Sequence, residues 1–188
     1  MESSTPDPWA GEGLRPRKRG HLQPVDSYLT GSWDALGAGA PVLVALAQIA
    51  SQAMVDDASV SLDQLSIEAR AILVSARSRG VIEIKGVPAA FDPADRWIAV
   101  YVQVDEDRTL AFRSREQPEV TIRFLEGFRQ LCQGGLVVHH LHHDFSLSHR
   151  GFQLARQQDE SSVREALQWG VEESFGWDLP RDLVDRQW

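Results

Sequence analysis

The sequence predicts an α+β protein in which helices are combined with small antiparallel β-hairpins. Apolar residues recur three and four positions apart in several segments, which is the period of a helix with one buried face. Two other segments, RWIAVYVQV (96–104) and TLAFRS (109–114), are rich in β-branched and aromatic residues and are joined by the turn DEDR. Since 43% of the 188 residues are hydrophobic and 24% are charged, a packed core is expected.

Net charge, the absence of long apolar runs and the cysteine count limit the kinds of protein that this sequence can encode. A formal net charge of −8 means that the chain as a whole does not attract nucleic acid, so a DNA contact needs a local basic patch. No apolar run approaches the roughly 18 residues of a membrane span, and the N-terminal MESSTPDPWAGEG has no apolar signal core. Cys132 is the only cysteine, which excludes an intrachain disulfide. We expect a cytoplasmic protein without a membrane contact and without a cofactor.

The segment from residue 41 to residue 85 predicts helices followed by a strand. Pro41 opens PVLVALAQIASQAM, which is apolar nearly all round and is expected to be a buried helix. The capping-box pattern SLDQ (61–64) predicts a short helix. Ser66 caps a longer helix over 67–79, and Gly80 ends that helix before the strand VIEIK.

The second half predicts a helix, a hairpin and two further helices. PEVTIRFLEGFRQLCQGG is a helix whose buried stripe has steps of three and four: Val120, Phe124, Phe128, Leu131 and Cys132. LVVHHL and FSLS are the strands of a hairpin, and Ser148 caps the helix HRGFQLARQ. The pair Ser162 and Glu165 predicts the start of a last helix, with one apolar face formed by Val163, Leu167, Val171 and Phe175.

These elements divide the chain into three parts. Residues 1–38 carry four prolines and scattered charge without a regular period, so they are expected to form an irregular arm. Residues 39–160 form the α+β domain. Residues 161–188 form a C-terminal helix and an acidic tail with large aromatic side chains.

Two stretches resemble the winged-helix superfamily. Residues 41–104 have its order of helix, short helix, longer helix, strand, loop and strand, and ILVSARSRGVIEIKG is similar to the junction of a recognition helix with the first wing strand. Residues 118–156 resemble it in FRQLCQGGLVVHH and in a closing pattern formed by Leu147, Ser148, Gly151, Leu154 and Ala155. The resemblance implies a winged-helix-like fold.

The same resemblance implies one possible function, that of a DNA-binding transcriptional regulator. Such a protein would use the helix over 67–79, the wing over 86–96 and the basic arm, with phosphate contacts from Arg15, Arg17, Lys18, Arg19, Arg70 and Arg77. Between Arg70 and Arg77, however, lie the apolar residues Leu73 and Val74. Because a reading face is polar and basic in DNA-binding members, this function is kept as an alternative, with weak DNA contact at most.

Four histidines and an aspartate lie close together in LVVHHLHHDFSLSHRG (136–151). If the strand continued, His140, His142 and Asp144 would point to one side and could hold zinc or iron, which makes a metal-dependent enzyme another alternative. A pH-responsive surface and a polar hairpin tip are the other interpretations. We favour the polar hairpin tip and predict no structural metal at these histidines, because the turn falls within this segment and no further ligand is spaced nearby to close the site.

We interpret Cys132, on an apolar helix stripe, as a small core residue rather than a nucleophile.

The function that we favour is that of a non-enzymatic adaptor or subunit. It would contact another protein, or another copy of itself, through the winged-helix-like domain and the C-terminal tail. Large aromatic side chains among acidic residues fit a docking segment, in which the aromatics fill pockets of a partner and the acids meet a basic rim. The other interpretation is that the C-terminal helix packs on the core through Val163, Leu167 and Val171, with Trp177 beside it. The predicted partner-binding residues are Trp169, Phe175, Trp177 and Trp188.

Overall fold

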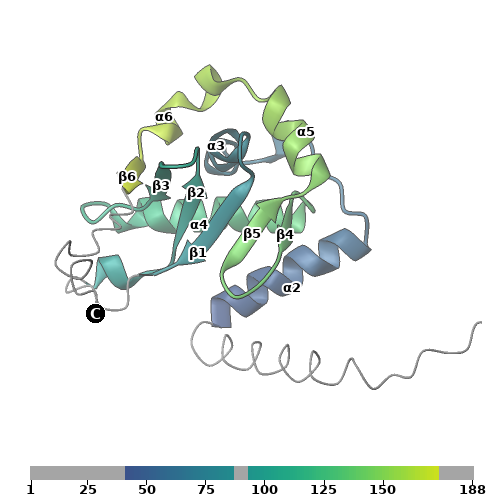
Figure 1. Ribbon diagram of the computed structural model, residues 1–188, viewed down its shortest axis with the longest axis horizontal. Coiled ribbons are helices and arrows are strands. Elements are labelled where there is room, and N and C mark those ends of the chain that lie inside the picture. Colours follow the sequence, from purple (N-terminus) through teal and green to yellow (C-terminus); the bar gives the residue numbers. More distant parts are fainter. Residues whose placement is uncertain (1–40, 87–92, 174–188) are drawn as a thin grey trace, which may run out of the picture.

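The computed structural model describes residues 41–86 and 93–173 (Figure 1). Within these ranges, five α-helices are combined with six strands of one antiparallel sheet, which confirms the α+β class. The winged-helix assignment stays a prediction. None of the described helices combines the length and the apolar character that crossing a membrane requires.

The elements follow one another in an order close to the predicted one. The helices are α2 (Pro41–Val55), α3 (Ile67–Ala76), α4 (Pro118–Gln133), α5 (His149–Gln157) and α6 (Arg164–Leu167). The strands are β1 (Val81–Lys85), β2 (Ala99–Gln103), β3 (Thr109–Phe112), β4 (Val137–His139), β5 (Asp144–Leu147) and β6 (Gly170–Glu173). Short 3₁₀ turns cover Leu62–Gln64, Ala94–Arg96 and Glu160–Val163.

Two of the predicted helix caps are formed, at Ser66 and Ser148, whereas the predicted cap at Ser162 is not, because α6 begins after Val163, which makes no side-chain cap. The Ser66 hydroxyl accepts a hydrogen bond from the backbone N–H of Ala69 at 3.2 Å, and the Ser148 hydroxyl accepts one from Gly151 at 3.0 Å. Each bond satisfies an N–H that the helix itself leaves without a partner. The helix capped by Ser66 is shorter than predicted, because α3 ends at Ala76 and the chain then turns to Gly80, whose φ of +73° favours glycine.

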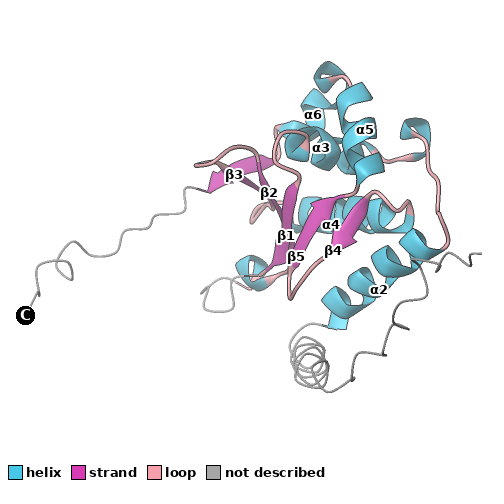
Figure 2. Cartoon of the chain, turned by 45° about the vertical axis from the view of Figure 1, so that its right-hand side comes forward, coloured by secondary structure: helices cyan, strands magenta, loops and turns pink. Residues whose placement is uncertain are grey.

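The strands form a single sheet in the order β4-β5-β1-β2-β3-β6, with every neighbouring pair antiparallel. The two predicted hairpins, β2–β3 and β4–β5, are present and antiparallel, and both belong to this one sheet. The pairing of β1 with β5 joins the β4–β5 hairpin to the β1–β2–β3 strands, with Ile82 opposite Phe145 and Glu83 opposite Asp144. Joining them lets one continuous apolar face be covered by helices (Figure 2).

The main core lies between one face of the sheet and the helices. Alternate strand residues such as Ile82, Ile84 and Val102 point into it and are fully buried. The predicted α4 stripe is buried, and two of its rings contact strand rings: Phe124 stacks on Phe112 with centroids 4.3 Å apart, and Phe128 meets Phe145 edge-on at 5.0 Å. The opposite face of the sheet, called the outer face below, has a separate small cluster of Ala99, Tyr101 and Ala111.

Helix α3 lies at the centre of the helical layer. Every residue from Ala71 to Ala76 is buried. Helices α4, α5 and α6 all contact α3, and Figure 1 shows α5 and α6 arching over it. The helix is therefore enclosed by protein on several sides.

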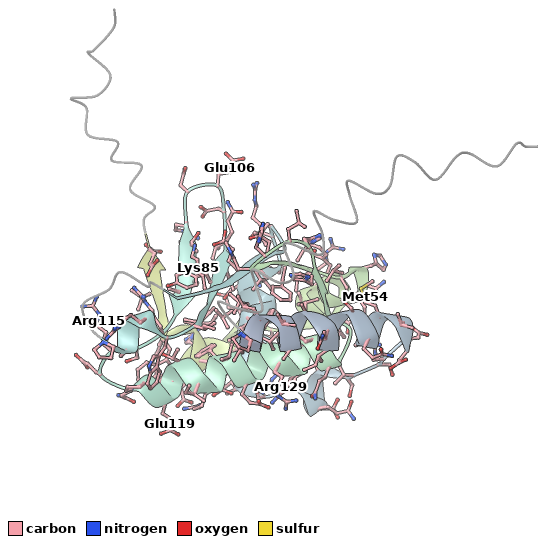
Figure 3. All side chains as sticks on the ribbon, turned by 90° about the horizontal axis from the view of Figure 1, so that it is seen from below. Met54, Lys85, Glu106, Arg115, Glu119 and Arg129 are labelled. Atoms are coloured by element: carbon pink, nitrogen blue, oxygen red, sulfur yellow. The ribbon has the colours of Figure 1, made fainter. Side chains whose placement is uncertain are left out.

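Helix α2 is less buried than its sequence predicted. It contacts α4 and β4 through Leu43, Leu46, Ala47, Ala50 and Ala53, but the other side of the helix is exposed. Val42, Met54 and Val55 are 45%, 52% and 80% exposed, respectively, and Met54 is labelled in Figure 3. The prediction of burial all round was wrong because α2 lies at the margin of the helical layer, where it has described neighbours on one side.

The predicted last helix is mostly replaced by a turn and a strand. Helix α6 ends at Leu167, and the chain then runs as β6 antiparallel to β3, with Val171 opposite Ala111 and Gly170 opposite Phe112. The spacing of Val163, Leu167 and Val171 is compatible with a helix, but pairing with the free edge of β3 overrides it. A Cβ on Gly170 would lie 3.3 Å from the Leu167 carbonyl oxygen, so a glycine suits this tight passage from helix to strand.

Candidate functional site

A groove at the β6 edge of the sheet has the clearest features of a docking surface. It has a volume of about 410 Å³ and is lined by Arg113, Ser114, Arg115, Glu116, Gln168, Trp169, Val171 and Glu173. The lining comes from two segments, the end of β3 with the loop after it and the chain from α6 into β6. Figure 3 labels Arg115 at this end of the molecule.

Two apolar side chains give the groove its binding potential. Trp169 is partly buried and packs against the main core, which holds its ring in place. Val171 is 54% exposed, although it belongs to a strand that pairs with β3. A held aromatic ring beside an exposed β-branched side chain is an apolar surface that loses little side-chain entropy on binding.

Arg113 adds a polar contact to this surface. Its Nη2 lies 2.8 Å from a carboxylate oxygen of Glu173 in an ion pair, and its guanidinium lies 6.0 Å from the centre of the Tyr101 ring. Its Nη1 is buried and has no hydrogen-bond partner among the described residues. A buried donor without an acceptor is costly, and the accessible part of the Arg113 contribution to the groove is therefore its charge.

The backbone of β6 is a further binding element. β6 is the last strand of the sheet, and within the described residues no other strand pairs with its outer edge. Free N–H and C=O groups at such an edge can pair with an added strand. The groove therefore joins backbone pairing capacity to an apolar contact and a guanidinium.

The predicted partner-binding residues are only partly described. Trp169 lies in the groove. Phe175, Trp177 and Trp188 lie outside the described residues and keep their predicted role from the sequence alone. Sequence reasoning missed Arg113 and Val171 as surface groups, because it placed Val171 on the buried face of a helix.

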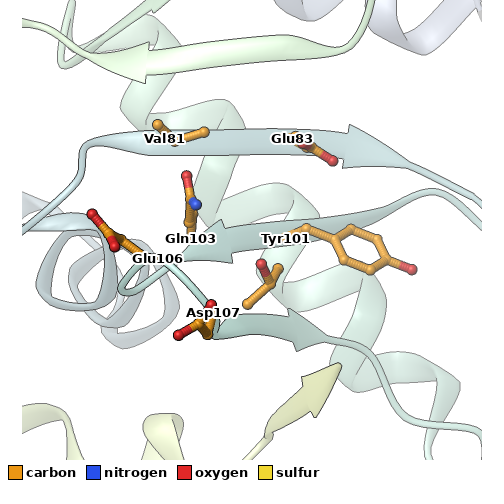
Figure 4. Close-up of a pocket in the computed structure, with 7 residues that line it drawn as sticks. Val81, Glu83, Tyr101, Gln103, Glu106 and Asp107 are labelled. Atoms are coloured by element: carbon orange, nitrogen blue, oxygen red, sulfur yellow. The ribbon is translucent and has the colours of Figure 1, made fainter. Parts of the chain in front are cut away.

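The outer face of the sheet carries a second hollow of about 340 Å³, shown in Figure 4. It is lined by Val81, Glu83, Tyr101, Gln103, Glu106, Asp107 and Thr109. Three of these side chains are carboxylates and none is a cation. Just beyond it, Lys85 lies 4.7 Å from the centre of the Tyr101 ring and is ion-paired with Glu83. The hollow therefore favours cationic over anionic groups.

The histidine hairpin is formed as predicted, but its turn comes earlier in the chain: β4 ends at His139 instead of Leu141, and Asp144 belongs to β5. The His140 N–H donates to the Asp144 carbonyl at 2.9 Å, and His142 has a φ of +51°, so residues 140–143 form the turn between β4 and β5. His140 Nε2 lies 2.8 Å from the Ser146 hydroxyl, and His139 Nε2 lies 3.1 Å from the His142 carbonyl oxygen.

The alternative metal set of His140, His142 and Asp144 is not among the groups of potential ligands that the described residues bring together. Among the described residues, the structure instead places Glu83, His143 and Asp144 so that one potential ligand atom from each lies within 4.8 Å of the others. Glu83 was missed because it comes from β1, far from the hairpin in sequence. Its position on the outer face was visible in VIEIK, where it alternates with two buried isoleucines.

The residues of the DNA-binding alternative are spread over different environments. Arg77 is engaged with Glu160 through an ion pair of 2.7 Å, and the Nε of Arg70 is buried without a described partner. Since Ala71–Ala76 are buried, the stretch of α3 between the two arginines has no surface to offer a groove of DNA. The basic residues Arg15, Arg17, Lys18 and Arg19 lie outside the described residues.

Cys132 is a core residue. Its side chain is fully buried on α4, and burial raises the pKa of the thiol to about 12. Because the thiolate is the nucleophilic form, this cysteine is unsuited to nucleophilic catalysis near neutral pH.

The chain matches no protein-family model, no curated protein and no solved structure.

Proposed function

We propose that this protein is a non-enzymatic adaptor or subunit that binds another protein, or a second copy of itself, through the groove at the β6 edge. The observation that carries the proposal is the position of Val171. It is 54% exposed on an edge strand, beside the partly buried Trp169. By sequence alone, the proposal also includes Phe175, Trp177 and Trp188 in the segment that follows β6.

The chemistry of the groove defines the kind of partner segment that would fit. An extended segment could pair with the free edge of β6 through its backbone. An apolar side chain of that segment would contact Trp169 and Val171, beside the guanidinium of Arg113. Aromatic and arginine residues at the centre of an interface commonly contribute most of its binding energy.

The DNA-binding alternative is less well supported. Its reading helix is enclosed, and one of its two described arginines is ion-paired within the protein. Nothing at the β6 edge favours a polyanion, because Arg113 and Arg115 share the groove with Glu116 and Glu173. We therefore keep the adaptor as the proposed function.

The test compares two valine substitutions in the full chain. Val171→Glu places a charge in the groove, and Val55→Glu places the same charge on the exposed side of α2, where the side chain is 80% exposed. Both proteins and the wild type are used to capture partners from native lysate, and self-association is measured by sedimentation velocity. Thermal melting checks that both variants are folded.

The proposal expects Val171→Glu to lose a partner, or a self-associated species, that wild type and Val55→Glu retain. Truncating an interface hot spot costs about 2 kcal/mol or more, which weakens binding roughly thirtyfold. Equal binding by all three proteins would exclude the β6 edge as the docking surface.

A further inference from the structure

We propose that Glu83, His143 and Asp144 form an exchangeable binding site for a divalent transition-metal cation such as Zn²⁺ on the outer face of the sheet. This site is separate from the groove at the β6 edge and does not depend on the adaptor function. One potential ligand atom from each side chain lies within 4.8 Å of the other two, a spacing that a single ion can bridge.

The backbone fixes the three residues relative to one another. Glu83 and Asp144 are directly opposite in the antiparallel pairing of β1 with β5. The Ile84 N–H donates to the His143 carbonyl at 3.0 Å, which extends the ladder by one residue and holds His143 beside this pair. The site is therefore built on paired strands, which position ligands better than a free loop does.

The pairing of two carboxylates gives an electrostatic reason for a cation. Like charges directly opposite in an antiparallel sheet repel each other and destabilise the pairing. In the structure, Lys85 is ion-paired with Glu83, and His143 Nε2 lies 3.5 Å from the Asp144 carboxylate. A divalent cation between Glu83 and Asp144 would neutralise both carboxylates at once, whereas Lys85 contacts one of them.

The donor set indicates which cations fit. One imidazole nitrogen with two carboxylate oxygens suits zinc and neighbouring transition metals, while Mg²⁺ and Ca²⁺ prefer oxygen ligands throughout. The side chains of Glu83, His143 and Asp144 are 31%, 44% and 50% exposed, so water or a partner group can occupy the remaining coordination positions. Such an open site exchanges its ion and differs from the closed set of a structural metal.

Lys85 provides a distinctive control. It holds the Glu83 carboxylate in the absence of a cation and lies over the Tyr101 ring. A cation at the site must replace Lys85 on Glu83 and is repelled by its charge. Removing that charge should therefore strengthen metal binding, which general damage to the fold would not do.

The test is calorimetric titration of the full-length protein with Zn²⁺, and with Mg²⁺ as the comparison ion. We expect one saturable Zn²⁺ site and no comparable Mg²⁺ site. Glu83→Gln, His143→Gln and Asp144→Asn should each weaken Zn²⁺ binding at least about tenfold, because even an outer-shell change commonly costs that much. Lys85→Met should strengthen it, and His140→Gln, which removes a nearby imidazole bonded to Ser146, should leave it within about twofold.

Glu83→Gln is the decisive variant because Glu83 is the only proposed ligand outside the histidine hairpin. If Zn²⁺ binding depends on His140 and is unchanged by Glu83→Gln, the ion is held by the hairpin histidines and the proposal is wrong. Absence of a saturable Zn²⁺ site, or weaker binding by a folded Lys85→Met variant, would also overturn it. Circular dichroism melting establishes that each variant is folded.

Discussion

The carboxylate of Glu68 on α3 accepts a hydrogen bond from the guanidinium of Arg123 on α4, and the Glu68 side chain is only 8% exposed. The arginine is half exposed, so the pair bridges the interior and the surface where the two helices pack. A second close contact lies nearby, because a Cβ on Gly127 would be 2.7 Å from the Ala69 backbone nitrogen. The α3–α4 contact therefore depends on both a glycine and a buried charge.

Removing the arginine should destabilise the protein. Arg123→Met leaves the Glu68 carboxylate in the interior without its cationic partner, and an unsatisfied buried acceptor costs roughly 1–3 kcal/mol, with the lower end expected here because solvent reaches Arg123. Urea unfolding followed by circular dichroism measures the change. Arg129→Met is the matched control, since it breaks a partly exposed pair with Glu126 on the same helix and should cost about 0.5 kcal/mol or less. Equal losses from the two substitutions would show that burial of Glu68 does not matter.

A methyl group on Gly151 should also destabilise the fold. A Cβ at this position would lie 2.1 Å from the backbone oxygen of Leu136, so α5 would have to move away from the start of the β4–β5 hairpin. Overpacking of this kind costs roughly 1–3 kcal/mol, even though alanine favours a helix. Thermal and urea unfolding of Gly151→Ala should show the loss, whereas Gln153→Ala, on the exposed side of the same helix, should stay within about 0.5 kcal/mol of wild type. A Gly151→Ala variant as stable as wild type would mean that α5 is not packed this closely.

Local chemistry explains why much of the fold could be predicted from the sequence. The serine caps at Ser66 and Ser148 act on backbone groups three residues away, and the α4 stripe repeats within one helix. The glycines after α4 and the histidine turn are equally local. All of these features lie within a few residues of one another, so no knowledge of distant pairing was needed.

The sites depend on contacts that no local pattern records. Glu83 meets Asp144 only because β1 pairs with β5, although β2, β3, α4 and β4 lie between them in the chain. Likewise, β6 forms where Glu173 meets Arg113 and Val171 pairs with Ala111, although the apolar spacing of this segment fitted a helix. Strand register is set by such long-range pairing, which explains why Glu83 and the β6 edge were missed.

The thiol of Cys132 should be unreactive in the folded protein. Burial raises its pKa from 9.0 to about 12, so almost no thiolate is present at pH 8. A chromogenic disulfide reagent should label one thiol in denaturant and none on the same time scale without it. Fast labelling of the native protein would contradict the buried position.

The same raised pKa makes a prediction about stability at high pH. The folded state holds the neutral thiol more strongly than the unfolded state, so this contribution is complete below about pH 9 and is lost as the pH rises towards 12. The stability of the wild type relative to Cys132→Ala should therefore fall across that interval, as measured by urea unfolding at each pH. A constant difference between the two proteins would contradict the assigned shift.

Sequence-dependent DNA binding should be absent at physiological salt. The chain has a net charge of −8, α3 is enclosed from Ala71 to Ala76, and Arg77 is ion-paired with Glu160. Any binding should be weak, should not distinguish duplex sequences and should fall steeply with salt, because it would consist of phosphate contacts alone. Fluorescence anisotropy with two unrelated duplexes over a range of salt concentrations measures the affinity, its dependence on the duplex sequence and its dependence on salt.

Neutralising the basic run RPRKRG (15–20) should then flatten the salt dependence of the binding constant by about one unit per lost phosphate contact. Nanomolar binding to one sequence, retained at physiological salt, would favour a DNA-binding regulator over the adaptor proposed here.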